Sequence, residues 1–478
     1  MHAAYPTSIP PYGPEGSRDD SFVAPPPWVT MRVLLVNPYL GFLSGRRGPV
    51  YDRPFPPVEL VNLAGLLRRD GHEVQLLDAA RERLWPLQVA SRARGFDRAF
   101  ITSSNLDRWC CPEVDVRPFV ETARALARVC GDSYLLGAHP TALPQAMLLR
   151  TGARAAIIGE PELTAAELAR KGDPRGVAGA AWLDRSGTLQ RGSPRSPMDL
   201  DELPVPAYEL LQPDVYQYEL LGGDLMVFEY SRGCPYRCSF CHRSMYGDDH
   251  RPKSLDRLWA EIEHARVVLG VRRAYFMDVE FTLDRERVLA LCERLTAAGT
   301  PLRWCCQTRV DRVDPELLAA MRGAGCELVH FGVEAGSQRV LDSVGKGITM
   351  DQCERAMAWC REAGLRTACF FLAGLPGQTP ADLDDTLRFA HRLAPTYASF
   401  HVAVPYPGSE LFQRLSSPPS DTFPTHLSDE FELDQLEAWV RWAFLSYYLR
   451  PSALARRLLT RDLFRAGRLL PIFMWYLG

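Results

Sequence analysis

The chain has 478 residues, of which 46% are hydrophobic and 24% are charged, and its formal net charge is -3. Single hydrophobic cores stop growing at roughly 250 to 300 residues, so we expect two or three domains. No apolar run approaches the ~20 residues that a membrane-spanning helix needs, and we therefore expect no membrane span. The small net charge gives no overall attraction to nucleic acid, so we expect no nucleic-acid partner.

The first thirty residues are rich in proline and lack hydrophobic periodicity, so we predict that residues 1–30 form a disordered extension. They also lack the apolar core of a secretory signal. The thirteen cysteines therefore indicate a reducing cytoplasm rather than disulfide bonds. Translation could equally begin at Met31, which directly precedes the first strand pattern. Lysine occurs only as Lys171, Lys253 and Lys346, a bias that GC-rich codon usage explains.

Residues 31–190 show short apolar runs that alternate with helical patterns, among them a helix in VELVNLAGLLRRDG and one from Val116 to Cys130. This alternation predicts a Rossmann-like, doubly wound α/β domain with a parallel sheet. Ligands of such sheets bind at the carboxyl ends of the strands. The loops that follow the predicted strands at this edge contain Asn37, Ser103, Ser104, Gly137, His139, Thr141, Gly159 and Glu160.

A linker over residues 191–224 contains acids and prolines, and a second series of strands and helices follows over residues 225–412. Its six strand patterns are LMVFEYSRG, AYFMDVEFT, LRWCCQTRV, LVHFGVEAGS, TACFFLAGLPG and ASFHVAVPYPGS. Six such units predict a partial (β/α)6 barrel, whose chemistry lies at the C-terminal ends of its strands. Residues 413–478 are predicted to form a helical C-terminal region that covers the mouth of the barrel; membrane docking of its last apolar stretch is the alternative.

Three cysteines follow the first strand of this second series in the segment CPYRCSFC, as Cys234, Cys238 and Cys241. The spacing lets one loop wrap three thiolates around a small inorganic cluster. Structural zinc favours four ligands, and the next cysteine, Cys292, lies beyond a helical pattern. Three thiolates suit a 4Fe-4S cluster with one iron left open. Buried core cysteines are the alternative, but this loop is not an apolar strand.

The other cysteines are predicted to be small hydrophobic core residues, because they occur singly or as adjacent pairs within strand or helix patterns. They include Cys110, Cys111, Cys305, Cys306, Cys326, Cys353, Cys360 and Cys369.

GCPYRCSFC resembles the signature of the radical S-adenosylmethionine (SAM) superfamily, with Phe240 as the aromatic residue before the last cysteine. The segments FMDVEFT, QTRVD, FGVEAGS, FFLAGLPGQT and PYPGSELF are similar to strand-end motifs of its branch with an N-terminal cobalamin-binding domain. This resemblance implies a cobalamin-dependent (class B) radical SAM enzyme. The cofactors it implies are a 4Fe-4S cluster, SAM and cobalamin, with an external one-electron reductant of the flavodoxin or ferredoxin type.

The resemblance also implies roles at the mouth of the barrel. Asp278 and Glu280 follow the second barrel strand, where the family binds the methionine ammonium; ordinary solvated acids are the alternative. Arg309 would pair with the carboxylate of SAM, and Glu334 with its ribose or ammonium. Gly374 would let the backbone approach the adenine, although a plain turn explains the Pro-Gly sequence equally well.

In the first domain, GAHPT and GEPELT are similar to patterns common in cobalamin-binding folds. The DxHxxG motif, which supplies a histidine to cobalt in other cobalamin proteins, is absent from residues 31–190. The lower axial position is therefore expected to lack a histidine of this domain. His139 would instead contact a phosphate or the nucleotide tail, and a turn histidine bonded to backbone is the alternative.

The function that the resemblance implies is transfer of a methyl group from methylcobalamin to an unactivated, carbon centre of a small molecule, after a 5'-deoxyadenosyl radical has removed a hydrogen. A specialised metabolite is favoured as the substrate over a hopanoid lipid or a tetrapyrrole. Relatives of this architecture also perform cyclisation, ring contraction or oxidation without methyl transfer, and this alternative stays open. A non-enzymatic cobalamin or redox sensor is the third hypothesis.

Overall fold

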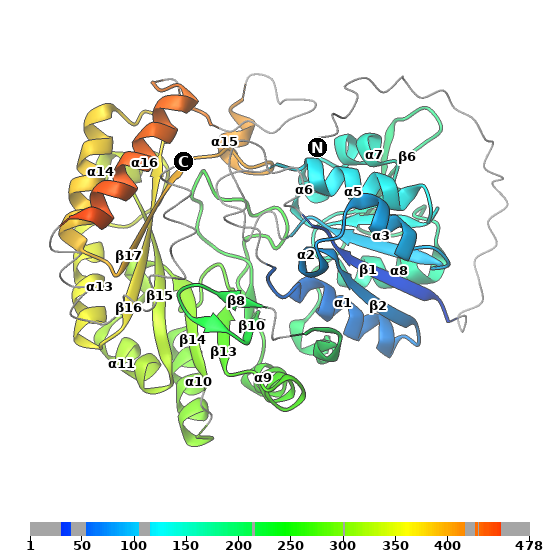
Figure 1. The fold of residues 1–478 in the computed structure, drawn as a ribbon, viewed down its shortest axis with the longest axis horizontal. Helices are drawn as coiled ribbons and strands as arrows, with labels where there is room; N and C mark the ends of the chain where they lie inside the picture. The colour runs from blue at the N-terminus through cyan, green and yellow to red at the C-terminus, as the bar shows by residue number, and fades with distance from the viewer. Residues whose placement is uncertain are drawn as a thin grey trace, which may run out of the picture.

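A computed structural model of the chain describes residues 30–39, 54–104, 115–212, 216–299, 302–415, 426–428 and 430–450 (Figure 1). The predicted N-terminal extension, Cys110, Cys111 and the last apolar stretch of the C-terminal region lie outside these residues. Within them, no helix combines the length and the apolar character that crossing a bilayer requires.

The first sheet has seven strands in the order β2-β1-β3-β4-β5-β6-β7. The five strands from β2 to β5 in this order are parallel, which confirms the doubly wound α/β prediction. Strands β6 and β7 are an antiparallel hairpin that the sequence patterns did not indicate, because runs of four and three residues are too short to show alternation. The bounds are β1 Arg32–Asn37, β2 Glu73–Asp78, β3 Arg98–Thr102, β4 Ser133–Leu136, β5 Ala155–Ile157, β6 Ala180–Leu183 and β7 Leu189–Arg191.

Helices cover both faces of this sheet, and each face has a core of its own. One core joins the sheet to α1 and α8, and the other joins it to α3, α5 and α7. Both predicted helices exist, as α1 and α5. The bounds are α1 Val58–Arg69, α2 Ala79–Glu82, α3 Pro86–Arg92, α5 Arg117–Ala127, α6 Ala138–Ala142, α7 Pro144–Thr151 and α8 Glu162–Lys171.

The connection to the second sheet packs back onto the first domain. The backbone N–H of Ala207 donates to the carbonyl of Val61 in α1 at 3.0 Å. Gly65 allows this approach, since a Cβ there would lie 2.7 Å from the carbonyl oxygen of Val205. The connection contains short elements only: η2 Leu200–Glu202, η3 Tyr208–Leu210, β8 Gln217–Tyr218 and β9 Gly222–Gly223.

The second sheet has six parallel strands in the order β10-β13-β14-β15-β16-β17, which confirms the predicted partial barrel. Helices lie along its outer side (Figure 1). The strands are β10 Leu225–Phe228, β13 Arg273–Phe276, β14 Arg303–Thr308, β15 Cys326–Glu334, β16 Arg366–Ala373 and β17 Tyr397–Val402, with a small ribbon of β11 Ser231–Arg232 and β12 Arg251–Pro252. The helices are α9 Leu255–Leu269, α10 Arg285–Ala297, α11 Pro315–Gly323, α12 Gln338–Ser343, α13 Met350–Glu362 and α14 Pro380–Leu393.

The predicted core cysteines of this half are buried and belong to one hydrophobic core around the barrel sheet. Cys369 illustrates the packing, since its Sγ lies 3.7 Å from the Sδ of Met357 in α13. Their burial agrees with the interpretation of these cysteines as apolar core residues.

The last strand, β17, leaves one edge of the barrel sheet without a further strand. Helix α16 Leu433–Leu449 packs against this strand, after the short helix α15 Glu410–Gln413. The hydroxyl of Tyr448 accepts from the backbone N–H of Ala398 and donates to its carbonyl, both at 3.0 Å. Part of the C-terminal region therefore satisfies backbone groups that an edge strand would expose.

Candidate functional site

The three cysteines of the candidate site lie on one loop, directly after the β11 strand and at the C-terminal edge of the barrel sheet. The backbone N–H of Cys234 donates to the carbonyl of Gly247, and that of Cys241 donates to the carbonyl of Cys238. Gly233 begins the loop with φ +81°, and a Cβ there would lie 2.0 Å from the carbonyl oxygen of Asp249. Only glycine fits this position, so the loop is folded tightly onto residues 247–249.

The thiols of this loop are close enough to influence one another and are largely shielded from water. Cys234 and Cys238 are each 8% exposed. Burial, together with the neighbouring thiols Cys238 and Cys234, raises the pKa of Cys241 to about 12. Burial also raises the pKa of Cys234 and of Cys238. Within the described residues no three metal-binding side chains converge at the spacing of a single ion, and three thiolates on one loop form the donor set of an iron-sulfur cluster.

Asp278 is hydrogen-bonded to the residues that directly precede the cysteine loop. Its carboxylate accepts from the hydroxyl of Ser231 at 2.6 Å and from the backbone N–H groups of Ser231 and Tyr230. Asp278 is 1% exposed, and burial raises its pKa to about 7. The sequence placed this acid correctly at the strand end, and the structure shows its oxygens bonded to the protein.

Glu280 lies two residues further on and is also buried. Its Oε1 accepts from the hydroxyl of Thr308, at the end of β14, and from Thr282 at 3.3 Å. Burial raises the pKa of Glu280 to about 7 against the opposing effect of Arg309 and Lys346. An acid in this position can accept a proton or pair with a cation near pH 7.

The guanidinium of Arg309 stacks on an aromatic ring of the cysteine loop and also donates hydrogen bonds to the protein. Its guanidinium carbon lies 3.7 Å from the centroid of Tyr236, between Cys234 and Cys238 in the sequence. The same group donates to Asp311 at 2.8 Å and to the carbonyl of Lys346 at 2.7 Å. Its donors are thus already bonded to the protein in this structure, whereas the family resemblance implies the carboxylate of SAM as their partner.

Glu334 ends β15 and forms a buried ion pair with Lys346, whose Nζ lies 2.7 Å from Oε1. Glu334 has φ +68°, a strained conformation for a residue that is not glycine. The Nζ of Lys346 also lies 5.8 Å from the ring centroid of Phe240 in the cysteine loop. The pair therefore connects the end of β15 to this loop.

Gly374 follows β16 with φ +85°, and its backbone N–H donates to the Oε1 of Gln378 at 2.7 Å. A Cβ at this position would lie 2.6 Å from a methyl carbon of Leu436 in α16. The close approach that glycine permits here is therefore made by the C-terminal helix in this structure.

The strand-end loops of the first sheet hydrogen-bond to one another. Ser103 Oγ accepts from the backbone N–H of His139 at 3.2 Å, and Thr141 Oγ1 accepts from the backbone N–H of Gly159 at 3.1 Å. Gly137, with φ +105°, fits closely here, since a Cβ would lie 2.6 Å from Ser103 Oγ. The loops after β3, β4 and β5 thus form one preassembled edge.

Two other predicted residues of this edge have structural contacts. Asn37, at the end of β1, donates to Asp78 Oδ1 at 2.8 Å, and the hydroxyl of Tyr216 donates to Asp78 Oδ2 at 2.5 Å. His139 is 1% exposed, and burial lowers its pKa to about 3, so its ring is neutral. Asn37 and His139 are therefore buried among protein atoms.

The two sheets meet at this edge through a buried ion-pair network, which we call the Arg232 cluster: Arg232, Glu160, Glu162, Glu229 and Arg251. Arg232 lies two residues before Cys234 and is fully buried. It donates to Glu160 at 2.9 Å, to Glu162 at 2.6 Å and to Glu229 at 3.0 Å. Glu160 also pairs with Arg251. Glu160 therefore joins the two domains, a role that its place in GEPELT did not indicate.

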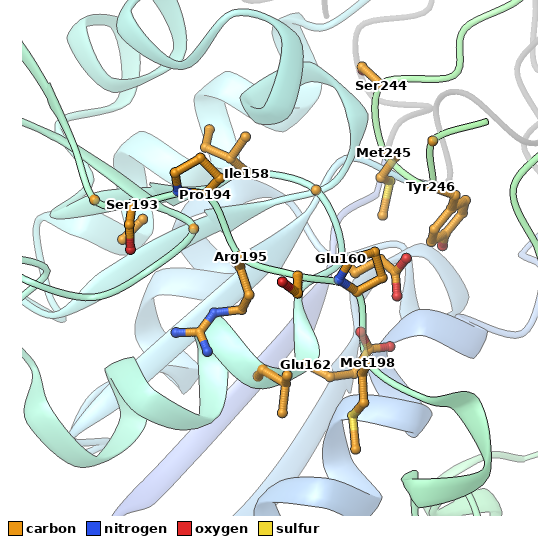
Figure 2. Close-up of a pocket in the computed structure, with 18 of the residues that line it drawn as sticks. Ile158, Glu160, Glu162, Ser193, Pro194, Arg195, Met198, Ser244, Met245 and Tyr246 are labelled. Atoms are coloured by element: carbon orange, nitrogen blue, oxygen red, sulfur yellow. The ribbon is translucent and has the colours of Figure 1, made fainter. Parts of the chain in front are cut away.

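Met245 forms a second contact between the sheets. Its Sδ lies 3.8 Å from Ser104 Oγ, and its carbonyl oxygen is 3.6 Å from the position of a Cβ on Gly159. A cavity of about 330 Å³ lies beside it, lined by residues 158–160, 162–163, 191–198 and 244–247 among others. Figure 2 shows Met245 and Tyr246 beside Glu160 at this cavity. Its lining joins the loop after β5 and the segment after β7 to residues 244–247, which follow the cysteine loop.

Sequence reasoning missed Ser231, Arg232, Tyr236, Met245 and Lys346. The rarity of lysine was a usable signal for one of them. In a chain with 55 basic residues, Lys253 and Lys346 are both buried and paired with a glutamate. The other four residues each have a partner that is remote in sequence, such as Asp278 for Ser231 and Glu162 for Arg232, so no local pattern indicated them.

Comparison with known proteins supports this description. Residues 228–390 match the model of the radical SAM superfamily. An uncharacterized methyltransferase of Pyrococcus horikoshii is 29% identical over 451 residues, which cover 89% of this chain and 94% of that protein. The anaerobic magnesium-protoporphyrin IX monomethyl ester cyclase of Cereibacter sphaeroides is 27% identical over 442 residues, covering 89% of this chain and 68% of its own.

A solved structure has the same fold as both halves of the chain. It is that of the radical SAM methyltransferase TsrM from Kitasatospora setae with cobalamin and a [4Fe-4S] cluster bound. The TM-score is 0.65 at 23% identity, and the alignment covers 80% of this chain and 74% of TsrM. The match of residues 228–390 confirms the radical SAM prediction for the barrel. Residues 228–390 thus form a radical SAM domain, and the chain has the two-domain fold of TsrM.

Proposed function

We propose that the chain is a cobalamin-dependent radical SAM methyltransferase that methylates an unactivated carbon of a small molecule, with a specialised metabolite as the favoured substrate. One observation carries this proposal. The loop with Cys234, Cys238 and Cys241 starts at the C-terminal edge of the barrel sheet, and the Arg232 cluster and Met245 join that loop to the strand ends of the first sheet. These contacts support two cofactor sites that face each other across one interface.

The cysteine loop fits an iron-sulfur cluster by the chemistry of its donors. Cys234, Cys238 and Cys241 would be its ligands, and Phe240, Asp278, Glu280, Arg309, Glu334 and Gly374 are the residues we assign around SAM. Both oxygens of Asp278 accept from the protein, and Glu334 is paired with Lys346. Glu280 is the acid we favour for the methionine ammonium, because its hydrogen bonds with two threonines use Oε1 alone. An external one-electron reductant of the flavodoxin or ferredoxin type completes the proposal.

We assign cobalamin to the strand-end edge of the first sheet, because ligands of parallel α/β sheets bind at the carboxyl ends of the strands. Gly159 has φ +78°, and the nearest atom to a Cβ there is the Met245 carbonyl oxygen at 3.6 Å, beside the 330 Å³ cavity. Within the described part of this domain, His72 bonds the backbone of Met31, at the opposite end of β1. His139 is buried. We therefore propose that cobalt receives no histidine from this domain, and that Asn37, Ser103, Ser104, Gly137, His139, Thr141, Gly159 and Glu160 shape or contact the site.

When bound, these groups supply a 5'-deoxyadenosyl radical and a transferable methyl group. The protein's own contribution is to orient the bound groups and to exclude water from them. Cys234 and Cys238 are 8% exposed, and Asp278 and Glu280 are 1% exposed. Such burial protects a radical from side reactions. The fixed contacts of Arg232 and Met245 hold the two sites in register, as proximity catalysis requires.

The test uses the full chain, reconstituted without oxygen with iron, sulfide and cobalamin, and SAM labelled in its methyl group. We expect S-adenosylhomocysteine, label on the corrin and 5'-deoxyadenosine, and iron, sulfide and cobalt in metal analysis. Replacement of Cys234, Cys238 and Cys241 by Ala should abolish 5'-deoxyadenosine formation. Formation of 5'-deoxyadenosine with neither S-adenosylhomocysteine nor labelled corrin would contradict methyl transfer. That result would favour a non-methylating cyclisation, ring contraction or oxidation, the candidate that the similarity to the cyclase supports.

A further inference from the structure

The inner face of the barrel sheet is defined by the register of its strands. In β16 and β17, Cys369, Phe371 and Phe400 face the helices: Cys369 contacts α13, and Phe400 packs edge-on against Trp439 of α16. Successive side chains of a strand point to opposite faces, so Phe370, Leu372, Ser399 and His401 face the interior. Phe370 lies beside Ser399, and Leu372 beside His401.

Side chains on the interior face of β16 and β17 are more exposed to solvent than side chains on the outer face. Phe371 and Phe400 are 0% exposed, whereas Phe370, Leu372 and Ser399 are partly exposed. His401 is 7% exposed. Phe370 lies three positions before Ala373, the last residue of β16 at the mouth, which is about 10 Å of strand. The partly exposed side chains at the mouth end of this face therefore begin at Phe370, about 10 Å of strand from the mouth.

Aromatic rings close the interior below this level. Tyr275 and His330 stack at 5.2 Å between centroids, and His330 and Phe370 are nearly parallel at 5.9 Å. Both nitrogens of His330 are bonded, one to the hydroxyl of Tyr218 at 2.8 Å and one to the carbonyl of Cys306 at 3.0 Å. The floor is thus a fixed layer of rings, of which Phe370 is the part that remains accessible.

The accessible interior residues carry no formal charge. At the mouth, Glu334 and Lys346 are paired with each other over Gly332, where a Cβ would be 2.3 Å from Oε1 of Glu334. At the other end of β16, Arg366 is paired with Glu327. Burial lowers the pKa of His401 to about 4, so its ring is neutral. His401 Nε2 lies 2.7 Å from Ser399 Oγ, and Nδ1 makes no hydrogen bond to the described residues.

We propose that the acceptor substrate is an uncharged molecule with a flat ring, which lies over Phe370 and Leu372 and forms a hydrogen bond with Nδ1 of His401. This proposal rests on the proposed function, because it takes the barrel interior as the acceptor's side of the reaction. A ring floor favours a flat partner, through stacking and through apolar burial. A charged partner would lose its hydration without gaining a counter-ion here, since Glu334 and Lys346 are already paired with each other.

The test measures binding of three probes to the full chain with its cofactors reconstituted and S-adenosylhomocysteine present. The probes are 2-naphthol, which is flat and neutral; decahydro-2-naphthol, which is neutral but not flat; and 2-naphthoate, which is flat and anionic. We expect 2-naphthol to bind at least about tenfold more tightly than the other two. His401→Phe should weaken 2-naphthol binding roughly 2- to 10-fold, the effect of one hydrogen bond, and Phe370→Ala should weaken it further.

Phe371→Leu is the matched control, since Phe371 neighbours Phe370 but faces the helices, and it should leave binding unchanged. Equal affinity for the three probes, tighter binding of 2-naphthoate, or unchanged binding in His401→Phe and Phe370→Ala would overturn the proposal. Loss of 2-naphthol binding when S-adenosylhomocysteine is added would also overturn it, by assigning the ring site to adenine. Failure of the proposed function is seen separately, as absence of 5'-deoxyadenosine and S-adenosylhomocysteine.

Discussion

Replacing Arg232 with methionine tests whether the Arg232 cluster holds the two domains together. The side chain is 1% exposed and pairs with Glu162, at 1% exposure, and with Glu229, at 3%. Methionine keeps much of the volume but leaves these carboxylates without their cation. Removing one partner of a buried ion pair costs about 3–5 kcal/mol. Arg251 still compensates Glu160, so we expect the loss to fall within this range rather than above it.

The destabilisation should grow as the pH rises. Burial already raises the pKa of Glu160 with both arginines present. Without Arg232, the folded variant keeps protons on buried glutamates that the unfolded chain releases near their ordinary pKa. The folded state then binds more protons than the unfolded state, and stability falls with increasing pH. We therefore expect a larger difference from the wild type at pH 8 than at pH 6.

The assay is urea unfolding followed by tryptophan fluorescence at both pH values. Arg285→Met is a matched control, because Arg285 also has three acidic partners but lies in solvent, where water screens them. It should change stability little. Adding Glu162→Gln to Arg232→Met should recover part of the loss, since it removes one stranded charge. A loss below about 1 kcal/mol at pH 8, typical of a surface pair, would refute the reasoning.

Three further substitutions test the site. The pKa of Asp278 is about 7 in the folded protein and 3.8 in the unfolded chain, so its carboxyl group makes stability fall as the pH rises between these values. Asp278→Asn should therefore reduce the dependence of stability on pH. Urea unfolding across this range would contradict the prediction if the slope of stability against pH were the same in the variant as in the wild type. Gly137→Ala should destabilise the first domain by at least about 1 kcal/mol through the strained φ and the clash with Ser103, and should weaken cobalamin retention on gel filtration. Lys346→Met should cost about 3–5 kcal/mol by stranding Glu334; thermal unfolding equal to that of the wild type would contradict a buried pair.

The sequence allowed the fold to be predicted almost completely, because its main strands are long enough to show a period. All six barrel strands and the five parallel strands of the first sheet lie where apolar runs indicated. The β6–β7 hairpin was missed because each strand has only three or four residues. Local alternation needs more residues than that to be distinguished from a loop.

The sequence predicted where the candidate site residues lie, but not which residues they hydrogen-bond to. Asp278 and Glu160 do lie at the strand ends that the sequence indicated. Their hydrogen bonds, however, run to Ser231, 47 residues away, and to Arg232, 72 residues away. A strand-end motif indicates at which edge of the sheet a side chain lies, but not whether that side chain is already hydrogen-bonded to a residue remote in sequence. The choice between ligand and structural roles therefore needed the three-dimensional contacts.

The bond between Tyr448 and Ala398 has a consequence for how the protein is made. The two residues are 50 positions apart. At about 5–20 residues per second, a ribosome needs roughly 3 to 10 s to add this length of chain. During that interval β17 can already pair with β16, but the groups of Ala398 that Tyr448 later satisfies remain open to strands of other molecules. The nascent chain is thus most exposed to aggregation late in synthesis, when most of the barrel sheet has been made.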